Sequence, residues 1–394
     1  MRILHITSQA PDTKSGGELG VYQTIKSLYL NDYDIDYVGP EIKKREISLF
    51  YRNLYYLSPD RNKIRRCLRL LQGITNSRYN AWRKLQLDCE KYDVVVLDFT
   101  KLDYIVKNNK IKKLIVKVHN VEYDYARNDY AKNGGITRKI IALMSKKQER
   151  AILDRADAIL TLTENDKNRL KELYGEQLEK KIVINPVAVE KKVNEGKKSK
   201  GFISLLITGS LWYGDNVDGA VWFIENVFSK LNFNARLVIA GSNPNEKIKR
   251  VVSKFSNIEL YDSPDSMAPF FETCDVVIAP VFEGAGMKVK VAEALSYSKI
   301  VVGTRHAFIG YDVIDCDNAF IADSEEEFIR ALNSIYSFTD NQWTEKQKRI
   351  EKLFLSKYSI ASSAKVWQKT VEIVSKEDIG YQEQKDNVKR KWSD

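Results

Sequence analysis

Residues 279–304 read APVFEGAGMKVKVAEALSYSKIVVGT and contain the clearest strand–loop–helix–strand pattern of the chain. An apolar run ends at Pro280, a loop with two glycines follows, and a helical pattern begins near Met287. The helical pattern ends near Ser298 and is followed by the β-branched run KIVVGT. Short β-branched runs that alternate with longer helical patterns are typical of parallel α/β architecture, which is the fold class that this stretch predicts.

The same alternation extends through most of the chain. Helices are predicted from Glu18 to about Tyr29 and from Thr137 to Leu153. In the N-terminal half the predicted strands are RILHIT (2–7), DIDYV (34–38), DVVVLDF (93–99), KLIVKVH (113–119), AILTL (158–162) and KIVIN (181–185). In the C-terminal half they are ISLLIT (203–208), ARLVIA (235–240), NIEL (257–260), DVVIAP (275–280) and KIVVGT (299–304).

A break in this pattern divides the chain into two Rossmann-like, doubly wound domains. Between Glu190 and Gly201 the sequence EKKVNEGKKSKG is charged and has no periodicity, which is typical of a linker. The length of 394 residues also favours two domains over one. The predicted parts are an N-terminal domain (1–189), the linker (190–201), a C-terminal domain (202–358), a C-terminal helix that packs back on the N-terminal domain (359–375) and a charged tail (376–394).

The composition excludes several classes of protein. Hydrophobic residues make up 43% and charged residues 29% of the chain, which excludes a largely disordered protein. The four cysteines form no CxxC pair and the three histidines lie far apart, so we expect neither a disulfide framework nor a metal site. The N-terminus has no signal-peptide pattern and no run approaches the roughly 18 apolar residues of a spanning helix. We therefore expect a cytoplasmic protein.

Basic residues are concentrated in one segment. Residues 41–85 contain twelve Lys and Arg against three Asp and Glu, interleaved with aromatic residues and leucines. Two interpretations remain open, a solvated helical face with loops or a surface that meets anionic lipid head groups, where each base contributes about 1 kcal/mol. We favour the second, which makes the protein peripheral on the inner face of the membrane. Nucleic acid is not an expected partner, because no recognition motif accompanies the charge.

The loop and helix in residues 279–304 have the properties of an anion site. Gly284 and Gly286 allow the backbone to approach a ligand, and the N-terminus of the following helix favours negative charge. Lys288 and Lys290 add positive charge, and Glu293 shares a helix face with Lys290 because the two are three residues apart. Bases for phosphate beside an acid for sugar hydroxyls suit a nucleoside diphosphate.

This segment resembles the donor-binding motif of glycosyltransferase family 4, the large retaining family with the GT-B fold of two Rossmann-like domains facing across a cleft. In the variant that it resembles, the motif reads G-x-G-x-[KR]-x-K-x-x-E-A. The matching residues are Gly284, Gly286, Lys288, Lys290, Glu293 and Ala294. The resemblance implies that Glu293 binds the nucleotide ribose and that Glu283, Ala285 and Met287 also belong to the donor site. Ala285 replaces the first Glu of the usual pair, which leaves open whether Glu283 substitutes for it.

Other segments resemble the same family. Gly209 and Ser210, at the end of a predicted strand, correspond to the place where backbone amides approach the donor diphosphate. Gly16 and Gly17 resemble the glycine loop of the N-terminal domain, which faces the same diphosphate. His119 directly follows the predicted strand KLIVKV, and the resemblance implies that it contacts the donor sugar.

The resemblance implies a metal-independent retaining glycosyltransferase without a cofactor. It would move a sugar from a nucleoside-diphosphate sugar, most simply a UDP-sugar, to a hydroxyl of a lipid-linked or growing surface polysaccharide. His119, Lys288 and Lys290 are the expected catalytic residues. Two alternatives are a non-catalytic GT-B accessory or glycan-binding subunit and a nucleotide-sugar epimerase. The lysine pair and Glu293 argue against the first, and the lack of a convincing acid/base set argues against the second.

Overall fold

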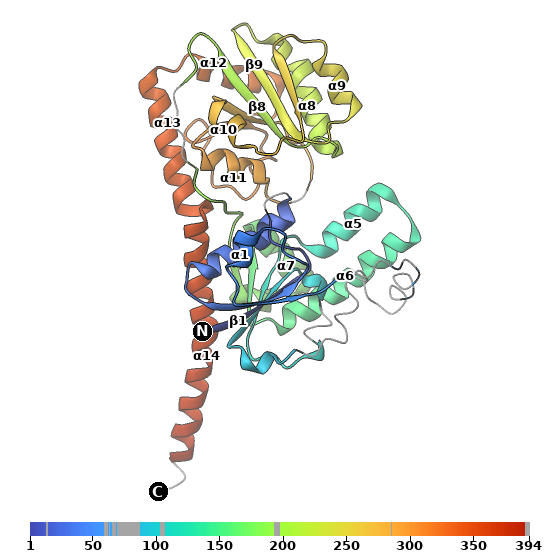
Figure 1. The fold of residues 1–394 in the computed structure, drawn as a ribbon, viewed down its shortest axis with the longest axis vertical. Coiled ribbons are helices and arrows are strands. Elements are labelled where there is room, and N and C mark those ends of the chain that lie inside the picture. The colour runs from blue at the N-terminus through green and yellow to red at the C-terminus, as the bar shows by residue number, and fades with distance from the viewer. Residues whose placement is uncertain are drawn as a thin grey trace. The chain divides into compact units, whose positions relative to one another are not determined.

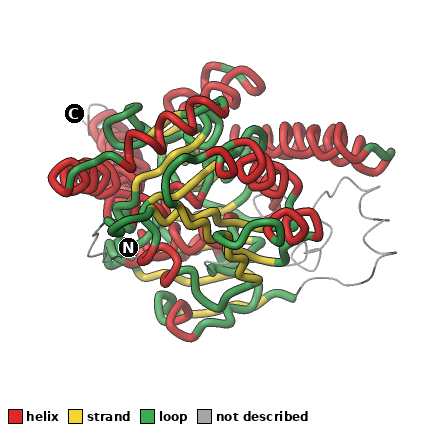
Figure 2. Tube along the Cα trace, turned by 90° about the horizontal axis from the view of Figure 1, so that it is seen from above, coloured by secondary structure: helices red, strands yellow, loops and turns green. Residues whose placement is uncertain are grey.

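The chain forms two compact α/β units. The computed structural model describes residues 1–12, 15–58, 62, 64, 68, 87–102, 107–192, 198–284 and 286–390. Unit 1 comprises Met1–Pro186 and Ser363–Asp394, and unit 2 comprises Val187–Ser362. Figure 1 shows a separate sheet in each unit, and the alternation of strands and helices can be followed by colour in Figure 2.

Unit 1 is built on a parallel sheet of seven strands in the order β3-β2-β1-β4-β5-β6-β7. Most of its strands are buried along nearly their whole length, as expected for a parallel sheet that is covered on both faces. The strands are β1 (Arg2–Thr7), β2 (Asp34–Gly39), β3 (Asn53–Tyr56), β4 (Val94–Asp98), β5 (Leu114–Lys117), β6 (Ala158–Thr161) and β7 (Ile182–Ile184).

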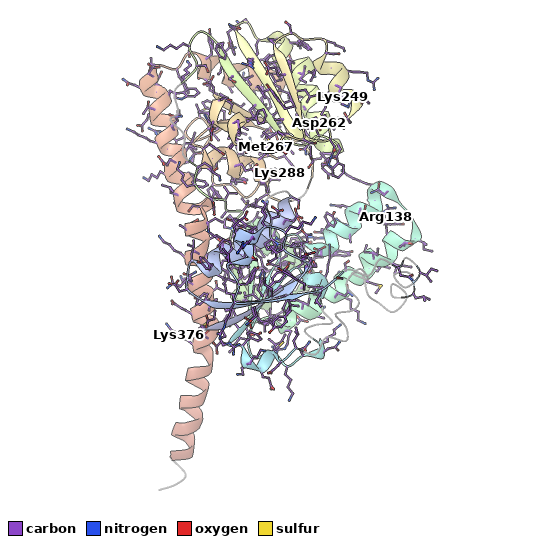
Figure 3. The ribbon with its side chains drawn as sticks, in the orientation of Figure 1. Arg138, Lys249, Asp262, Met267, Lys288 and Lys376 are labelled. Carbon is purple, nitrogen blue, oxygen red and sulfur yellow. The ribbon has the colours of Figure 1, made fainter. Side chains whose placement is uncertain are left out.

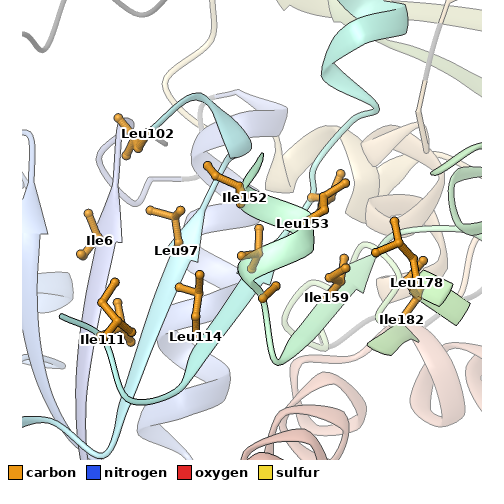
Figure 4. Close-up of a cluster of buried hydrophobic side chains, with 14 of the residues drawn as sticks. Ile6, Leu97, Leu102, Ile111, Leu114, Ile152, Leu153, Ile159, Leu178 and Ile182 are labelled. Carbon is orange, nitrogen blue, oxygen red and sulfur yellow. The ribbon is translucent and has the colours of Figure 1, made fainter. Parts of the chain in front are cut away.

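Helices cover this sheet and divide its core into two clusters. The described helices of unit 1 are α1 (Gly16–Tyr29), α2 (Arg45–Ser48), α5 (Glu122–Asn133), α6 (Ile136–Arg155), α7 (Glu164–Tyr174) and most of α14 (Ile360–Arg390), with 3-10 turns at Cys89–Lys91, Thr100–Leu102 and Glu176–Lys181. Leu4 and Leu97 belong to the cluster in Figure 4, whereas Ile3 and Val96 belong to the other. Because adjacent strand residues point to opposite faces, the two clusters lie on opposite sides of the sheet.

Unit 2 repeats this plan with a parallel sheet of six strands in the order β10-β9-β8-β11-β12-β13. The strands are β8 (Ile203–Ser210), β9 (Ala235–Ser242), β10 (Ile258–Asp262), β11 (Val276–Ala279), β12 (Ile300–Gly303) and β13 (Phe320–Ile321). The helices are α8 (Gly214–Asn226), α9 (Glu246–Val252), α10 (Ala268–Thr273), α11 (Val289–Ser296), α12 (Glu325–Tyr336) and α13 (Asp340–Leu353), with a 3-10 turn at Phe228–Lys230 and a π turn at Phe354–Tyr358.

The predicted fold class, two Rossmann-like α/β domains with parallel sheets, is confirmed. Two edge strands, β3 and β13, were not predicted. Residues 53–56 lie in the basic segment 41–85, where no strand was predicted, yet they pair with β2. Residues 53–56 form a strand because they pair with a neighbouring strand, and the local sequence pattern does not show this pairing. Helix α1 begins at Gly16, two residues before the predicted start, so that Gly16 and Gly17 lie in its first turn.

None of the described helices combines the length and the apolar composition that crossing a membrane would require.

Helix α14 completes one of the two core clusters of unit 1. Trp367, Val371 and Val374 lie in the same cluster as Ile3 and Ile25. Trp367 is 0% exposed, so its side chain is completely enclosed by neighbouring residues.

We expect Trp367→Ala to destabilise the protein by about 3–5 kcal/mol, because truncating a fully buried aromatic leaves a cavity in the core. Urea unfolding followed by circular dichroism measures the loss. Ile373→Ala is the matched control on the same helix, because Ile373 is 49% exposed; its effect should stay within about 0.5 kcal/mol. Equal midpoints for the two variants would contradict the packing role of Trp367.

Candidate functional site

In unit 2, the loop between β11 and α11 places a lysine against a glycine turn. Lys288, labelled in Figure 3, directly precedes the first residue of α11. Its Nζ donates hydrogen bonds to the carbonyl oxygens of Gly284 (2.8 Å) and Gly286 (3.1 Å). Both glycines have positive φ, 98° and 71°, which other residues adopt only with strain. His306 reinforces the turn, because its Nε2 lies 2.6 Å from the carbonyl oxygen of Gly284.

The second lysine connects this loop to the end of β8. Lys290 lies in the first turn of α11, and its Nζ donates to Oδ1 of Asn216 (2.9 Å). Asn216, in the first turn of α8, donates from Nδ2 to the carbonyl oxygen of Ser210 (3.1 Å). A methyl group at Gly209 would lie 3.3 Å from the Lys290 ammonium, so the two are in close contact. The structure thus brings together the predicted Gly209, Ser210 and Lys290, and adds Asn216.

Burial makes both lysines and the neighbouring glutamate unusually easy to neutralise. Burial lowers the pKa of Lys288 to about 8, although Asp215 opposes the shift. Burial, and next the charge of Lys288, lower the pKa of Lys290 to about 8. Burial raises the pKa of Glu293 to about 7 against the attraction of Lys290 and Lys192. All three side chains keep some solvent exposure, so they line a surface rather than the closed core.

This arrangement can hold an anion next to a hydroxyl-bearing group. Burial disfavours the charged form of the two adjacent lysines, and a bound anion would stabilise that form. Within the part of the chain that the structure describes, nothing donates a hydrogen bond to the Glu293 carboxylate, which leaves its oxygens able to accept from ligand hydroxyls.

The remaining predicted donor residues of unit 2 differ in their surroundings. Glu283 is exposed, and Ala285 lies outside the described residues. Met287 is buried, and its sulfur accepts a hydrogen bond from the backbone N–H of Val187 (3.4 Å). This contact gives Met287 a packing role within the unit.

In unit 1, a buried carboxylate gathers polar side chains at the end of the sheet. Asp98 ends β4, and its register partners are Thr7 of β1 and Lys117 of β5. The Nε2–H of His119 donates to Asp98 Oδ1 (2.8 Å), and the Nε2–H of His5 donates to Asp98 Oδ2 (2.6 Å). The predicted His119 therefore lies in a network with His5, and the central Asp98 was not predicted.

Burial and hydrogen bonds shift the pKa values of the groups in this network in different directions. Burial alone would raise the pKa of Asp98, but the hydrogen bonds from His119 and His5 outweigh it and hold this pKa below its usual range. Burial lowers the pKa of His119 despite the hydrogen bond to Asp98. Burial also lowers the pKa of Lys117 to about 8, while Asp98 opposes the shift. A carboxylate beside a neutral imidazole is the state that these shifts favour near neutral pH.

The His119 ring is held on two sides. Phe99 stacks on it with ring centroids 4.2 Å apart and an interplanar angle of 19°. The backbone of Phe99 has φ 75°, which is rare for a bulky residue and costs on the order of 1–3 kcal/mol. On another side, a methyl group at Gly20 would lie 2.4 Å from Nδ1 and Cε1 of the ring. Gly20 of α1 is thus a further residue that the sequence analysis missed. A methyl group at the predicted Gly17 would instead meet the flexible side chain of Gln9.

A second buried carboxylate fixes the helix that follows His119. Glu149 of α6 accepts hydrogen bonds from the backbone N–H groups of Glu122 (2.9 Å) and Tyr123 (3.2 Å) at the start of α5. It also accepts from the Tyr174 hydroxyl (2.7 Å). Burial raises the pKa of Glu149 to about 7, although these hydrogen bonds oppose the shift. The predicted helix contained Glu149, but a single Glu among lysines and arginines gives no signal of burial.

No group of three or more His, Cys, Asp or Glu side chains within the described ranges is arranged to hold a metal ion.

A family model and a curated relative match parts of this chain. Residues 203–337 match the family model "Glycosyl transferases group 1". A Klebsiella pneumoniae relative, described as an uncharacterized 44.6 kDa protein in the cps region, is 24% identical over 358 residues, which cover 84% of this chain and 90% of the relative.

Two solved structures share the fold over nearly the whole chain. Sucrose-phosphate synthase from Thermosynechococcus elongatus aligns with a TM-score of 0.70 and 13% identity over 95% of this chain and 99% of that one. The Anabaena protein HepE in complex with UDP-glucose aligns with a TM-score of 0.61 and 10% identity over 95% and 99% of the two chains. The chain therefore has the two Rossmann-like domains of GT-B glycosyltransferases, and unit 2 carries a glycosyl transferases group 1 domain.

Proposed function

We propose that this protein is a retaining glycosyltransferase of family 4 that transfers a sugar from a nucleoside-diphosphate sugar to a hydroxyl acceptor. The observation that carries the proposal is the cluster of Lys288, Lys290 and Glu293 within the segment matched by the glycosyl transferases group 1 model. A UDP-sugar is the first donor to test, because the HepE structure contains UDP-glucose. The Klebsiella relative from a cps region supports a lipid-linked or growing surface polysaccharide as the acceptor.

The chemical task of the lysines is to stabilise the leaving group. As the bond between the sugar and the diphosphate breaks, negative charge develops on the phosphate oxygens, and preorganised ammonium groups lower the energy of that state. Asn216 holds the Lys290 ammonium in place before the substrate arrives. The new glycosidic bond forms on the face that the diphosphate leaves, and the departing phosphate takes the proton of the acceptor hydroxyl. Glu293 binds the ribose, and His119 contacts the donor sugar.

A non-catalytic accessory subunit is the alternative that one observation favours. Ala285 stands where many relatives of the motif have Glu, so one contact to the donor is missing. Detectable transfer from any nucleotide sugar would exclude this alternative. An epimerase would instead convert the nucleotide sugar without an acceptor.

We also propose that the basic segment 41–85 meets an anionic membrane surface. Its described apolar residues divide between the core and the surface. Ile42, Ile47 and Tyr51 are buried, and the exposed ones are Leu49, Tyr55, Tyr56, Ile64 and Leu68. Residues 59–61, 63, 65–67 and 69–85, which include most of its bases, lie outside the described residues. These exposed apolar residues and the excess of positive charge support this part of the proposal.

Glu293→Ala should weaken UDP binding by about 1.5–3 kcal/mol, because it removes hydrogen bonds from ribose hydroxyls to a carboxylate. The variant should fold at least as stably as the wild type. The raised pKa means that ionised Glu293 costs stability above pH 4–5, roughly the unfolded pKa range. Isothermal titration calorimetry measures the affinity. Glu246→Ala is the control, because Glu246 is exposed and pairs with Lys249; an equal loss in both variants would contradict the assignment.

The affinity for UDP should fall as the pH rises above about 8. Lys288 and Lys290 both have a pKa of about 8, so they are charged at pH 7 and mostly neutral at pH 9. Each lysine that must regain its proton on binding costs about tenfold in affinity per pH unit above its pKa. Titrations at pH 7, 8 and 9 measure this dependence, and Lys290→Met should bind more weakly and with a shallower slope. A constant affinity across the range would contradict the role of the lysines.

We propose transfer without a divalent cation, because the two ammonium groups can neutralise the diphosphate. Turnover with the best nucleotide sugar should therefore be unchanged in excess EDTA. The control is the same assay with added magnesium or manganese after removal of the chelator. Activity that is abolished by EDTA and restored by either metal would show that the lysines do not suffice.

A further inference from the structure

The polar network at the end of β4 extends beyond the residues that the proposed function requires. Asp98 has no exposed surface and so touches no substrate. Its two oxygens nevertheless receive the Nε2–H groups of two histidines that lie on different segments. Thr24 of α1 also places its hydroxyl 3.2 Å from Asp98 Oδ1. A carboxylate with three such neighbours is an acceptor that fixes the donors around it.

The geometry determines which nitrogen of His119 carries the proton. A carboxylate cannot donate, so the nitrogen that faces it, Nε2, must hold the hydrogen. In a neutral imidazole the other nitrogen, Nδ1, then has a free lone pair. None of the described residues donates a hydrogen bond to Nδ1. His119 is 7% exposed, and Gly20, which packs against this side of the ring, has no side chain to cover it.

We propose that Asp98 is a positioning residue that holds His119 as the Nε2–H tautomer, so that Nδ1 accepts a hydrogen bond from a substrate hydroxyl. His119 acts in this way as an acceptor rather than as an acid. This inference rests on the proposed function for the identity of the substrate, but the tautomer itself is a property of the free protein. Phe99 stacks on the His119 ring and so fixes its orientation, although the backbone of Phe99 is strained.

The tautomer can be read directly by NMR. The chain has only three histidines, so a protein labelled with ring-15N histidine gives few resonances. His306→Gln removes one set, and His5→Gln separates the remaining two. At pH 8 the wild type should show His119 protonated at Nε2 and not at Nδ1, with the Nε2 proton protected from exchange. A proton on Nδ1 or a doubly protonated ring at this pH would overturn the proposal.

Asp98→Asn tests the positioning role against a purely structural one. The amide has the same shape but offers one acceptor oxygen in place of two, so it can accept from only one of the two histidines and the Nε2 proton of His119 should lose its protection from exchange. The value of kcat/KM for a UDP-sugar should fall about tenfold or more, the worth of one well-formed hydrogen bond. The Kd of UDP alone should stay within about twofold, since Lys288, Lys290 and Glu293 belong to unit 2.

Thr24→Val is the matched control, because Thr24 donates to the same carboxylate and forms no hydrogen bond with His119. It should keep the tautomer and the wild-type kcat/KM. Unchanged kcat/KM in Asp98→Asn, or an equal loss of UDP affinity, would overturn the proposal. If no nucleotide sugar is turned over by the wild type, the proposed function fails, while the NMR result still decides the tautomer. Addition of UDP-glucose should shift the Nδ1 resonance more than UDP does, and equal shifts would count against a sugar hydroxyl as the donor.

Discussion

The buried carboxylate of Asp98 is the charge around which the end of the unit 1 sheet is organised. A carboxylate without solvent is stable only when hydrogen bonds replace the lost water, and here they come from β1, from α1 and from the segment after β5. Lys117 of the neighbouring strand adds a positive charge and donates to the carbonyl oxygen of Gly20 (3.0 Å). One ionised group thereby links three strands to the helix that follows the first of them.

In unit 2, two lysines rather than a central carboxylate lie beyond the end of the parallel sheet. Its two lysines donate to carbonyl and amide oxygens, and the charges of Asp215 and Glu293 also act on them. These neutral oxygens hold the ammonium groups in place without themselves carrying a negative charge. Glu293 lies close enough to influence Lys290, yet burial keeps part of the carboxyl population protonated near neutral pH.

Local patterns in the sequence were enough to predict most strands and the glycine loop with Lys288, Lys290 and Glu293, because these features lie within one strand–loop–helix segment. His119 was predicted from the family resemblance of the segment in which it follows an apolar run. The residues that the sequence did not reveal, such as Asp98 and Asn216, act through partners far away in the chain. Their roles depend on which strands become neighbours and in which register, and local hydrophobic periodicity predicts neither property.

The position of helix α14 in the chain also determines when the core of unit 1 can be completed during translation. Unit 2 consists of one continuous stretch, Val187–Ser362, whereas unit 1 needs residues from both sides of it. During translation, all residues of unit 2 leave the ribosome before Trp367, Val371 and Val374 can cover their side of the unit 1 core. The nascent first unit therefore exposes Ile3, Ile25 and their neighbours while the second unit folds, a period in which a chaperone could bind that apolar face.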